Sequence, residues 1–168
     1  MTGPSKEQLE EIEAPQGSVG APLPHVVTDE QNLFIAYLVE EHASSFDSTN
    51  PRTVAPDDDT QTTAIIEAIG YRAILFGPPN DEAISGHRLY KLGLRPYSSF
   101  EVLNSGWVAA LEKANRVHQH HRPESFAKLR HFIFTFHDST VEFIATRFNV
   151  KLYKGPVRRA AADALATW

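Results

Sequence analysis

The strongest chemical signal is the pair His137 and Glu142, which flank a turn after the alternating segment 131–137. A hairpin closing at residues 139–140 places His137 opposite Glu142 on one face of a β-ribbon. A carboxylate that accepts from one imidazole nitrogen raises the basicity of the other, as a general base requires. We therefore predict His137 and Glu142 as catalytic residues and Asp138 as a substrate-binding residue. The alternatives are a cross-strand ion pair, or a turn in which Asp138 binds backbone N–H groups.

A second polar group follows Pro79 in a stretch that carries few core-like residues. Mixed carboxylate and imidazole groups on a loop can do acid–base work, so Asp81 and His87 are predicted to be catalytic. Asn80 and Glu82 are predicted to bind substrate. The alternative is structural, because Asn80-Asp81 suits a turn and Glu82 suits a helix start. The sequence leaves open whether this loop reaches the hairpin.

Histidines also cluster at His118, His120 and His121, with His131 ten residues further on. Clustered imidazoles can hold Zn²⁺, Ni²⁺ or Cu²⁺. A helix that ends at His118 directs these side chains apart, and a cation there suits the helix dipole. We favour an exposed helix end, and we predict neither a metal nor an organic cofactor.

The strands that must position these groups are indicated by short apolar runs. Residues 33–39 favour a buried strand, although a helix is the alternative. Residues 62–76 predict one long strand or two short ones, with Gly70 as a bulge or bend. In residues 131–137 the alternation puts the phenylalanines on one face, which we assign to the core, and the histidines on the other. Shorter strands are predicted over 100–103 and 149–154.

Three helices are predicted. The clearest spans residues 106–118, and Asn104 or Ser105 caps its N-terminus. A short helix follows Pro123, and Pro156 opens the last one. Glu101 is predicted to bind substrate at the end of the preceding strand, and Asn104 could share that pocket, although the cap is the favoured role.

These elements predict an α+β fold: one antiparallel sheet of about five strands with one or two helices packed on its aromatic face. Residues 1–26 are expected to be a disordered acidic leader, and residues 27–168 a single globular domain. Residues 1–60 hold 12 acidic against two basic residues, whereas residues 61–168 hold nine acidic against 14 basic ones. The basic residues form no dense stripe, so nucleic-acid binding is not expected.

Several functional classes lack their defining residues. The chain has no cysteine, which excludes disulfides, thiolate metal sites and cysteine nucleophiles. The sequence contains no Walker loop, no Gly-x-Gly-x-x-Gly after a strand, no Gly-x-Ser-x-Gly and no His-Glu-x-x-His. No apolar run is long enough for a membrane helix, and the N-terminus is unlike a signal peptide. We therefore predict a cytoplasmic protein without a membrane partner.

Two sequence blocks carry a resemblance. Phe76-Gly-Pro-Pro-Asn-Asp-Glu-Ala83 and His131-Phe-Ile-Phe-Thr-Phe-His-Asp-Ser-Thr140, followed by Glu142, resemble a family of small bacterial proteins of unknown function. The similarity spans roughly residues 76–145 and departs at Phe143, where the family pattern has cysteine. The resemblance implies a bacterial, cytosolic, single-domain protein. It transfers no functional residue, because no activity is established for that family.

Two functions of different classes remain open. In the first, the protein binds a small organic substrate and performs cofactor-independent isomerisation, cyclisation or hydration. His137 would be the base, oriented by Glu142, and His87 or Asp81 the acid or anchor. In the second, the same polar residues fix a loop and a surface of a non-catalytic binding or interaction protein. An aromatic-rich sheet is compatible with a homodimer, although nothing in the sequence requires one.

Overall fold

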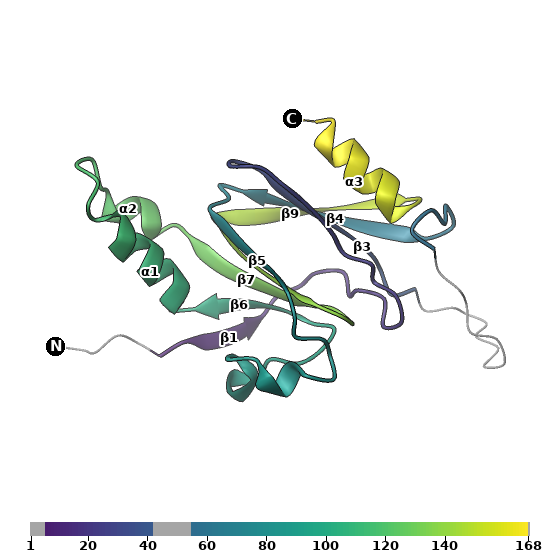
Figure 1. The fold of residues 1–168 in the computed structure, drawn as a ribbon, viewed down its shortest axis with the longest axis horizontal. Coiled ribbons are helices and arrows are strands. Elements are labelled where there is room, and N and C mark those ends of the chain that lie inside the picture. Colours follow the sequence, from purple (N-terminus) through teal and green to yellow (C-terminus); the bar gives the residue numbers. More distant parts are fainter. Residues whose placement is uncertain (1–5, 42–54, 168) are drawn as a thin grey trace.

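The computed structural model describes residues 6–41 and 55–167, which form two antiparallel β-sheets with helices on their outer faces (Figure 1). The five-stranded sheet has the order β1 (Gln8–Glu11), β6 (Ser99–Leu103), β7 (Arg130–Thr135), β8 (Thr140–Ala145), β5 (Ala73–Gly77). The four-stranded sheet has the order β2 (His25–Thr28), β3 (Leu33–Leu38), β4 (Thr62–Ile69), β9 (Arg147–Lys154). The helices are α1 (Gly106–Asn115), α2 (Pro123–Phe126) and α3 (Val157–Leu165), with 3₁₀ turns η1 (Ile84–Gly86) and η2 (Tyr90–Leu92). The predicted α+β class is confirmed.

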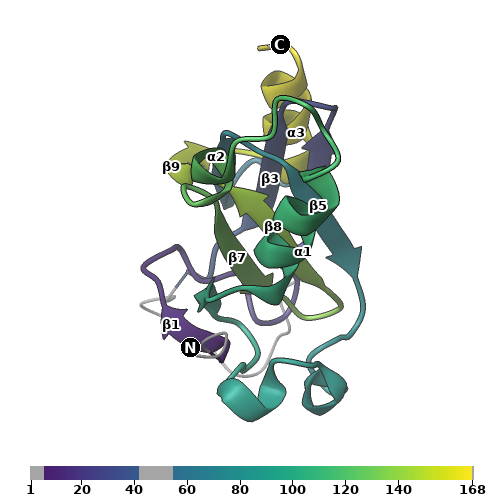
Figure 2. The ribbon, with the colours of Figure 1, turned by 90° about the vertical axis from the view of Figure 1, so that its left-hand side faces the viewer.

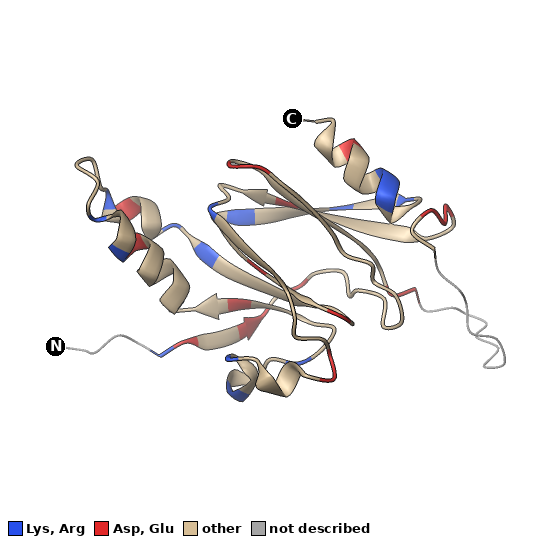
Figure 3. Ribbon diagram, in the orientation of Figure 1, with Lys and Arg blue, Asp and Glu red and all other residues tan. Residues whose placement is uncertain are grey.

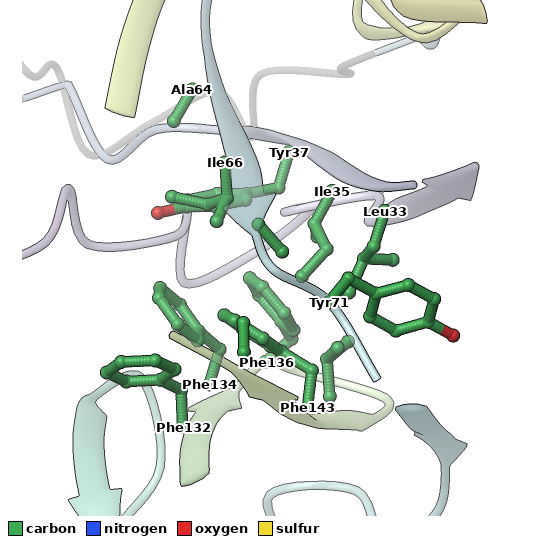
Figure 4. Close-up of a cluster of buried hydrophobic side chains, with 13 residues drawn as sticks. Leu33, Ile35, Tyr37, Ala64, Ile66, Tyr71, Phe132, Phe134, Phe136 and Phe143 are labelled. Carbon is green, nitrogen blue, oxygen red and sulfur yellow. The ribbon is translucent and has the colours of Figure 1, made fainter. Parts of the chain in front are cut away.

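The main core lies between the two sheets. Figure 4 shows Phe132, Phe134 and Phe143 of the five-stranded sheet facing side chains of the other sheet. Those opposing side chains include Leu33, Ile35, Tyr37, Ala64 and Ile66. The phenylalanine face is buried as the alternation predicts. It is covered by a second sheet, whereas one sheet with helices on that face was expected.

The backbone passes from one sheet to the other at two neighbouring places, between β4 and β5 and between β8 and β9. The 62–76 stretch forms β4 and β5, which are separated at Gly70, where the backbone has a φ of +67°. At the second place, a single residue, Thr146, separates β8 from β9. Gly70 therefore marks the bend that the sequence predicted, and the bend moves the chain from one sheet to the other.

The β7–β8 hairpin has a different register from the predicted one. Glu142 lies opposite Ile133, and Thr135 lies opposite Thr140. The turn is at His137-Asp138, closed by the N–H of Phe136 donating to the carbonyl of Ser139. The predicted His137–Glu142 pairing is therefore wrong. The residue opposite Glu142 moves by four positions, an even number, so Glu142 keeps its predicted face of the ribbon, whereas His137 lies in the turn beyond β7.

The predicted disordered leader is wrong for residues 6–26. β1 pairs with the free edge of β6, with Leu9 opposite Val102. The following segment is held on β3, where the Tyr37 hydroxyl donates to the carbonyl of Pro15 at 2.7 Å. Amino-acid composition does not predict this strand, because an edge strand is stabilised by backbone hydrogen bonds and needs little apolar burial.

The outer faces are covered by the helices and by one long loop. α3 packs on the four-stranded sheet, where Val157 and Ala160 contact Ala36 and Leu38. Figure 2 looks onto α1, which lies over β7. α1 ends at Asn115, three residues before the predicted end. No helix in the described residues is long and apolar enough to cross a membrane.

Candidate functional site

The loop of residues 78–98, between β5 and β6, packs on the outer face of the five-stranded sheet. Its buried side chains Ile84, Leu89 and Leu94 contact Phe100 and Ile133. These apolar contacts fix the loop and bring its polar residues against the β7–β8 hairpin. The sequence left this approach open, and the structure shows that the loop does reach the hairpin.

Glu142 is the centre of a buried polar network. Its carboxylate accepts hydrogen bonds from His131 Nε2 at 2.9 Å, His87 Nε2 at 3.2 Å and Arg88 at 2.8 Å. The residue is 5% exposed. Burial raises the pKa of the Glu142 carboxyl, but the bonds from His131 and His87 and the charge of Arg88 outweigh it. The pKa therefore lies well below its usual range, and the carboxylate is ionised at neutral pH.

His131 connects this carboxylate to a serine. Its ring is fully buried, and its Nδ1 lies 2.8 Å from the Ser105 hydroxyl oxygen. In the neutral imidazole whose Nε2–H donates to the ionised Glu142, Nδ1 is the acceptor and the Ser105 hydroxyl donates to it. Trp107 packs edge-on against the imidazole with ring centroids 5.2 Å apart. The result is a continuous hydrogen-bonded chain from Ser105 through His131 to Glu142.

The Ser105 end of this chain borders a cleft of about 490 Å³ between α1, α2 and the strands β6 and β7. Its polar lining includes Glu101, Asn104, Ser105, Glu112, Arg130 and His131. Val102, Val108 and Phe126 contribute apolar walls. This volume lies within the range that small-molecule sites occupy in proteins.

A second cluster lies at the tip of the hairpin. His137 Nδ1 is 3.0 Å from an Asp81 carboxylate oxygen and 2.8 Å from the Tyr97 hydroxyl. The His137 side chain is 42% exposed, and its Nε2 lies 4.0 Å from Asp138. His137 is thus oriented by Asp81 of the loop, while Glu142 is held by other residues. Neither His137 nor Asp81 lines the 490 Å³ cleft.

The Tyr97 hydroxyl contacts both Asp81 and His137. The hydroxyl donates to Asp81 at 2.5 Å, and this bond, with a smaller contribution from His137, lowers the pKa of Asp81. Desolvation and the same carboxylate raise the pKa of Tyr97. Asp81 is therefore a carboxylate and Tyr97 a neutral donor at neutral pH.

The remaining predicted site residues are dispersed. Asn80 accepts from the N–H of Ala83 at 3.0 Å in a turn, and Glu82 is exposed. The Asp138 side chain is 87% exposed. Glu101 lines the cleft, where it is paired with Arg130.

Of the histidines near residue 120, His121 is bound to two other side chains. His121 lies 2.9 Å from both Asn115 Oδ1 and Glu112 Oε1. Within residues 6–41 and 55–167, no group of three or more His, Asp or Glu side chains is arranged to hold a metal ion. His131, which the sequence placed with this cluster, belongs to the Glu142 network.

Sequence reasoning missed Ser105 and His131 as a connected pair. Ser105 was considered only as a helix cap, a role it also has, because it accepts from the N–H of Val108 at 3.2 Å. The available signal was strand parity, which places His131 on the same face as Glu142. Only the observed strand register shows that the His131 and Glu142 side chains meet.

No family model, curated protein or solved structure matches the chain. The resemblance carried by the two sequence blocks therefore stays a prediction.

Proposed function

We propose that the protein binds a small organic molecule in the 490 Å³ cleft and performs acid–base chemistry there with a His–Glu pair. The pair is His131 with Glu142, in place of the His137–Glu142 pair expected from the sequence. The observation that carries the proposal is the relay from Ser105 through His131 to Glu142, which begins at the wall of this cleft.

The relay supports proton transfer for a physical reason. The Glu142 carboxylate fixes the Nε2–H tautomer of His131 and stabilises the imidazolium that forms when Nδ1 accepts a proton. Ser105 is 9% exposed and borders the cleft beside the buried His131, so a proton can pass from a bound molecule to His131 through the serine hydroxyl. No bound cofactor is needed for this transfer.

The test is turnover of small acid–base-sensitive compounds by the full chain, followed by ¹H NMR. The panel contains esters, lactones, enones and keto acids. Ala109 lines the cleft, so Ala109→Trp should obstruct it, whereas Ala110→Trp is a matched control on the same helix outside the lining. We expect turnover to fall about 10²- to 10⁴-fold in His131→Gln, to be lost in Ala109→Trp and to persist in Ala110→Trp. Turnover that is absent, or equal in all variants, would contradict the proposal.

A second candidate is a non-catalytic binding or interaction protein. It is favoured because the same network connects five parts of the fold: the residue before β1, the 78–98 loop, the N-terminus of α1, β7 and β8. In the described residues, every buried side-chain polar atom has a hydrogen-bond partner. A fully satisfied network of this kind rigidifies a fold without chemistry. The same panel decides, because this candidate predicts no turnover by the folded wild-type chain.

The cytoplasmic location and the homodimer stay predictions from the sequence. Figure 3 shows acidic positions on β1 and β6 and basic positions on β7 and β9.

A further inference from the structure

Ser105 occupies a position that serves both as a helix cap and as a reactive group. It is the N-cap of α1, and its side-chain oxygen accepts from the N–H of Val108 and lies 2.8 Å from His131 Nδ1. A hydroxyl hydrogen-bonded to an imidazole that is backed by a carboxylate is the arrangement of an activated serine nucleophile. We propose that Ser105 is the nucleophile of the cleft and that the protein hydrolyses small carboxylic esters, an inference that rests on the proposed function.

The helix end beside Ser105 carries a positive partial charge, which the carboxylate of Glu7 already uses in part. The N-terminus of a helix carries a partial positive charge, and α1 is ten residues long. The carboxylate of Glu7 already accepts from the N–H of Gly106 at 2.8 Å, and Arg88 lies 3.1 Å from the same carboxylate. This end of the helix therefore accommodates an anionic group within the folded chain.

The burial of His131 restricts the leaving group. In serine hydrolases with an exposed histidine, the imidazolium also protonates the leaving nitrogen of an amide. The His131 ring is 0% exposed and contacts Ser105 and Trp107, so it reaches the nucleophile while being shielded from the departing atom. The substrate class is thus an ester of an acidic alcohol or phenol, because such a group leaves without protonation. The apolar walls formed by Val108 and Phe126 suit a small uncharged acyl group.

The proposed reaction has an acylation step and a hydrolysis step. Ser105 Oγ attacks the ester carbonyl, its proton moves to His131 Nδ1, and the bond from the carbonyl carbon to the leaving oxygen breaks, releasing an alkoxide or phenolate. Water then attacks the acyl carbon, the bond from carbon to Oγ breaks, and Oγ takes back the proton from Nδ1. The carboxylate product and both protons of the water enter solvent.

Two probes test the nucleophile with the full chain. p-Nitrophenyl acetate and butyrate report a burst of p-nitrophenolate, and diisopropyl fluorophosphate labels an activated serine, read by intact mass and peptide mapping. We expect one adduct per chain, on the peptide that contains Ser105. Ser105→Asn keeps a side-chain acceptor for the helix cap but has no hydroxyl, so it should abolish both the burst and the label. Ser125→Ala, an exposed serine in the nearby α2, should leave both unchanged.

The outcomes separate this inference from the proposed function. Ester turnover that persists in Ser105→Asn, or a label on another residue, would overturn the nucleophile. His131-dependent turnover of other panel compounds without any burst would also overturn it, while the acid–base proposal would stand. Loss of the burst and label in Ser105→Asn, with amide NMR spectra that match the wild type outside the cleft, would support it.

Discussion

The Glu142 carboxylate is stable inside the fold because three donors surround it. His131, His87 and Arg88 each contribute one hydrogen bond, and the loop that carries two of them is itself packed on the sheet. A buried carboxylate of this kind ties stability to its ionisation, because the folded state favours the charged form more than the unfolded state does.

We expect Glu142→Gln to destabilise the protein by about 3 kcal/mol at pH 7, because it removes the buried charge that His131, His87 and Arg88 bind and leaves Arg88 only Glu7 as an anionic partner. The folded pKa of Glu142 is lowered, so its contribution is present above the unfolded pKa of about 4.3 and is lost as pH falls toward the folded value. Chemical denaturation at pH 7 and pH 3 should therefore show a smaller difference between variant and wild type at pH 3. A pH-independent difference would contradict this assignment. Glu10→Gln, at a carboxylate outside the network, is the matched control.

At the hairpin tip, Tyr97 controls the ionisation of Asp81. Tyr97→Phe removes the hydroxyl donor that contributes most to lowering the pKa of Asp81, so this pKa should rise toward its ordinary value of 3.8. A ¹³C NMR titration of the Asp81 carboxyl measures the change. Tyr90→Phe, at an exposed tyrosine, should leave it unaltered. An unchanged Asp81 pKa in Tyr97→Phe would show that the hydroxyl bond does not form in solution.

At the scale of elements, the corner between the sheets depends on a single glycine. Gly70 has a positive φ, and a Cβ atom added there would lie 2.5 Å from the hydroxyl oxygen of Thr146. The bend therefore needs both the left-handed backbone and the missing side chain.

Gly70→Ala should destabilise the protein by about 2 kcal/mol, because an L-residue is strained in this conformation and its Cβ meets Thr146. Thermal or denaturant unfolding provides the measurement. Gly86→Ala, where an added Cβ meets no atom within 4 Å, is the control and should change stability little. Equal stability of the two variants would mean that the corner relaxes around the new side chain.

At the scale of the whole molecule, the N-terminal strand completes the five-stranded sheet and reaches the site. β1 covers the edge of β6, and Glu7, just before β1, bonds both Gly106 of α1 and Arg88 of the loop. The chain terminus and the Glu142 network therefore support one another over a long separation in sequence.

Removal of residues 1–12 should lower the melting temperature by about 5 °C or more, equivalent to about 2 kcal/mol for a chain of this size. Amide hydrogen exchange should increase in β6, whose edge becomes exposed to water. A chain that begins at residue 6 keeps β1 and serves as the control. Unchanged exchange in β6 would contradict the pairing and would favour the disordered leader expected from composition.

The sequence by itself determined the local features. Alternation of side chains along a strand fixed the phenylalanine face of residues 131–137, because successive residues of an extended chain point to opposite sides. Gly70 marked a bulge or bend, and Asn104 or Ser105 marked the start of α1, because backbone freedom and helix capping depend on neighbouring residues alone.

Only the tertiary structure decided which side chains meet. The register that separates His137 from Glu142, the second sheet over the phenylalanines and the pairing of β1 all depend on contacts between distant segments. Each such contact is chosen by the total packing and hydrogen bonding of the molecule, and a local pattern is equally compatible with several partners. Strand parity placed His131 and Glu142 on one face of the sheet. Only the folded chain brought Ser105 into contact with His131, on the side of the imidazole away from Glu142.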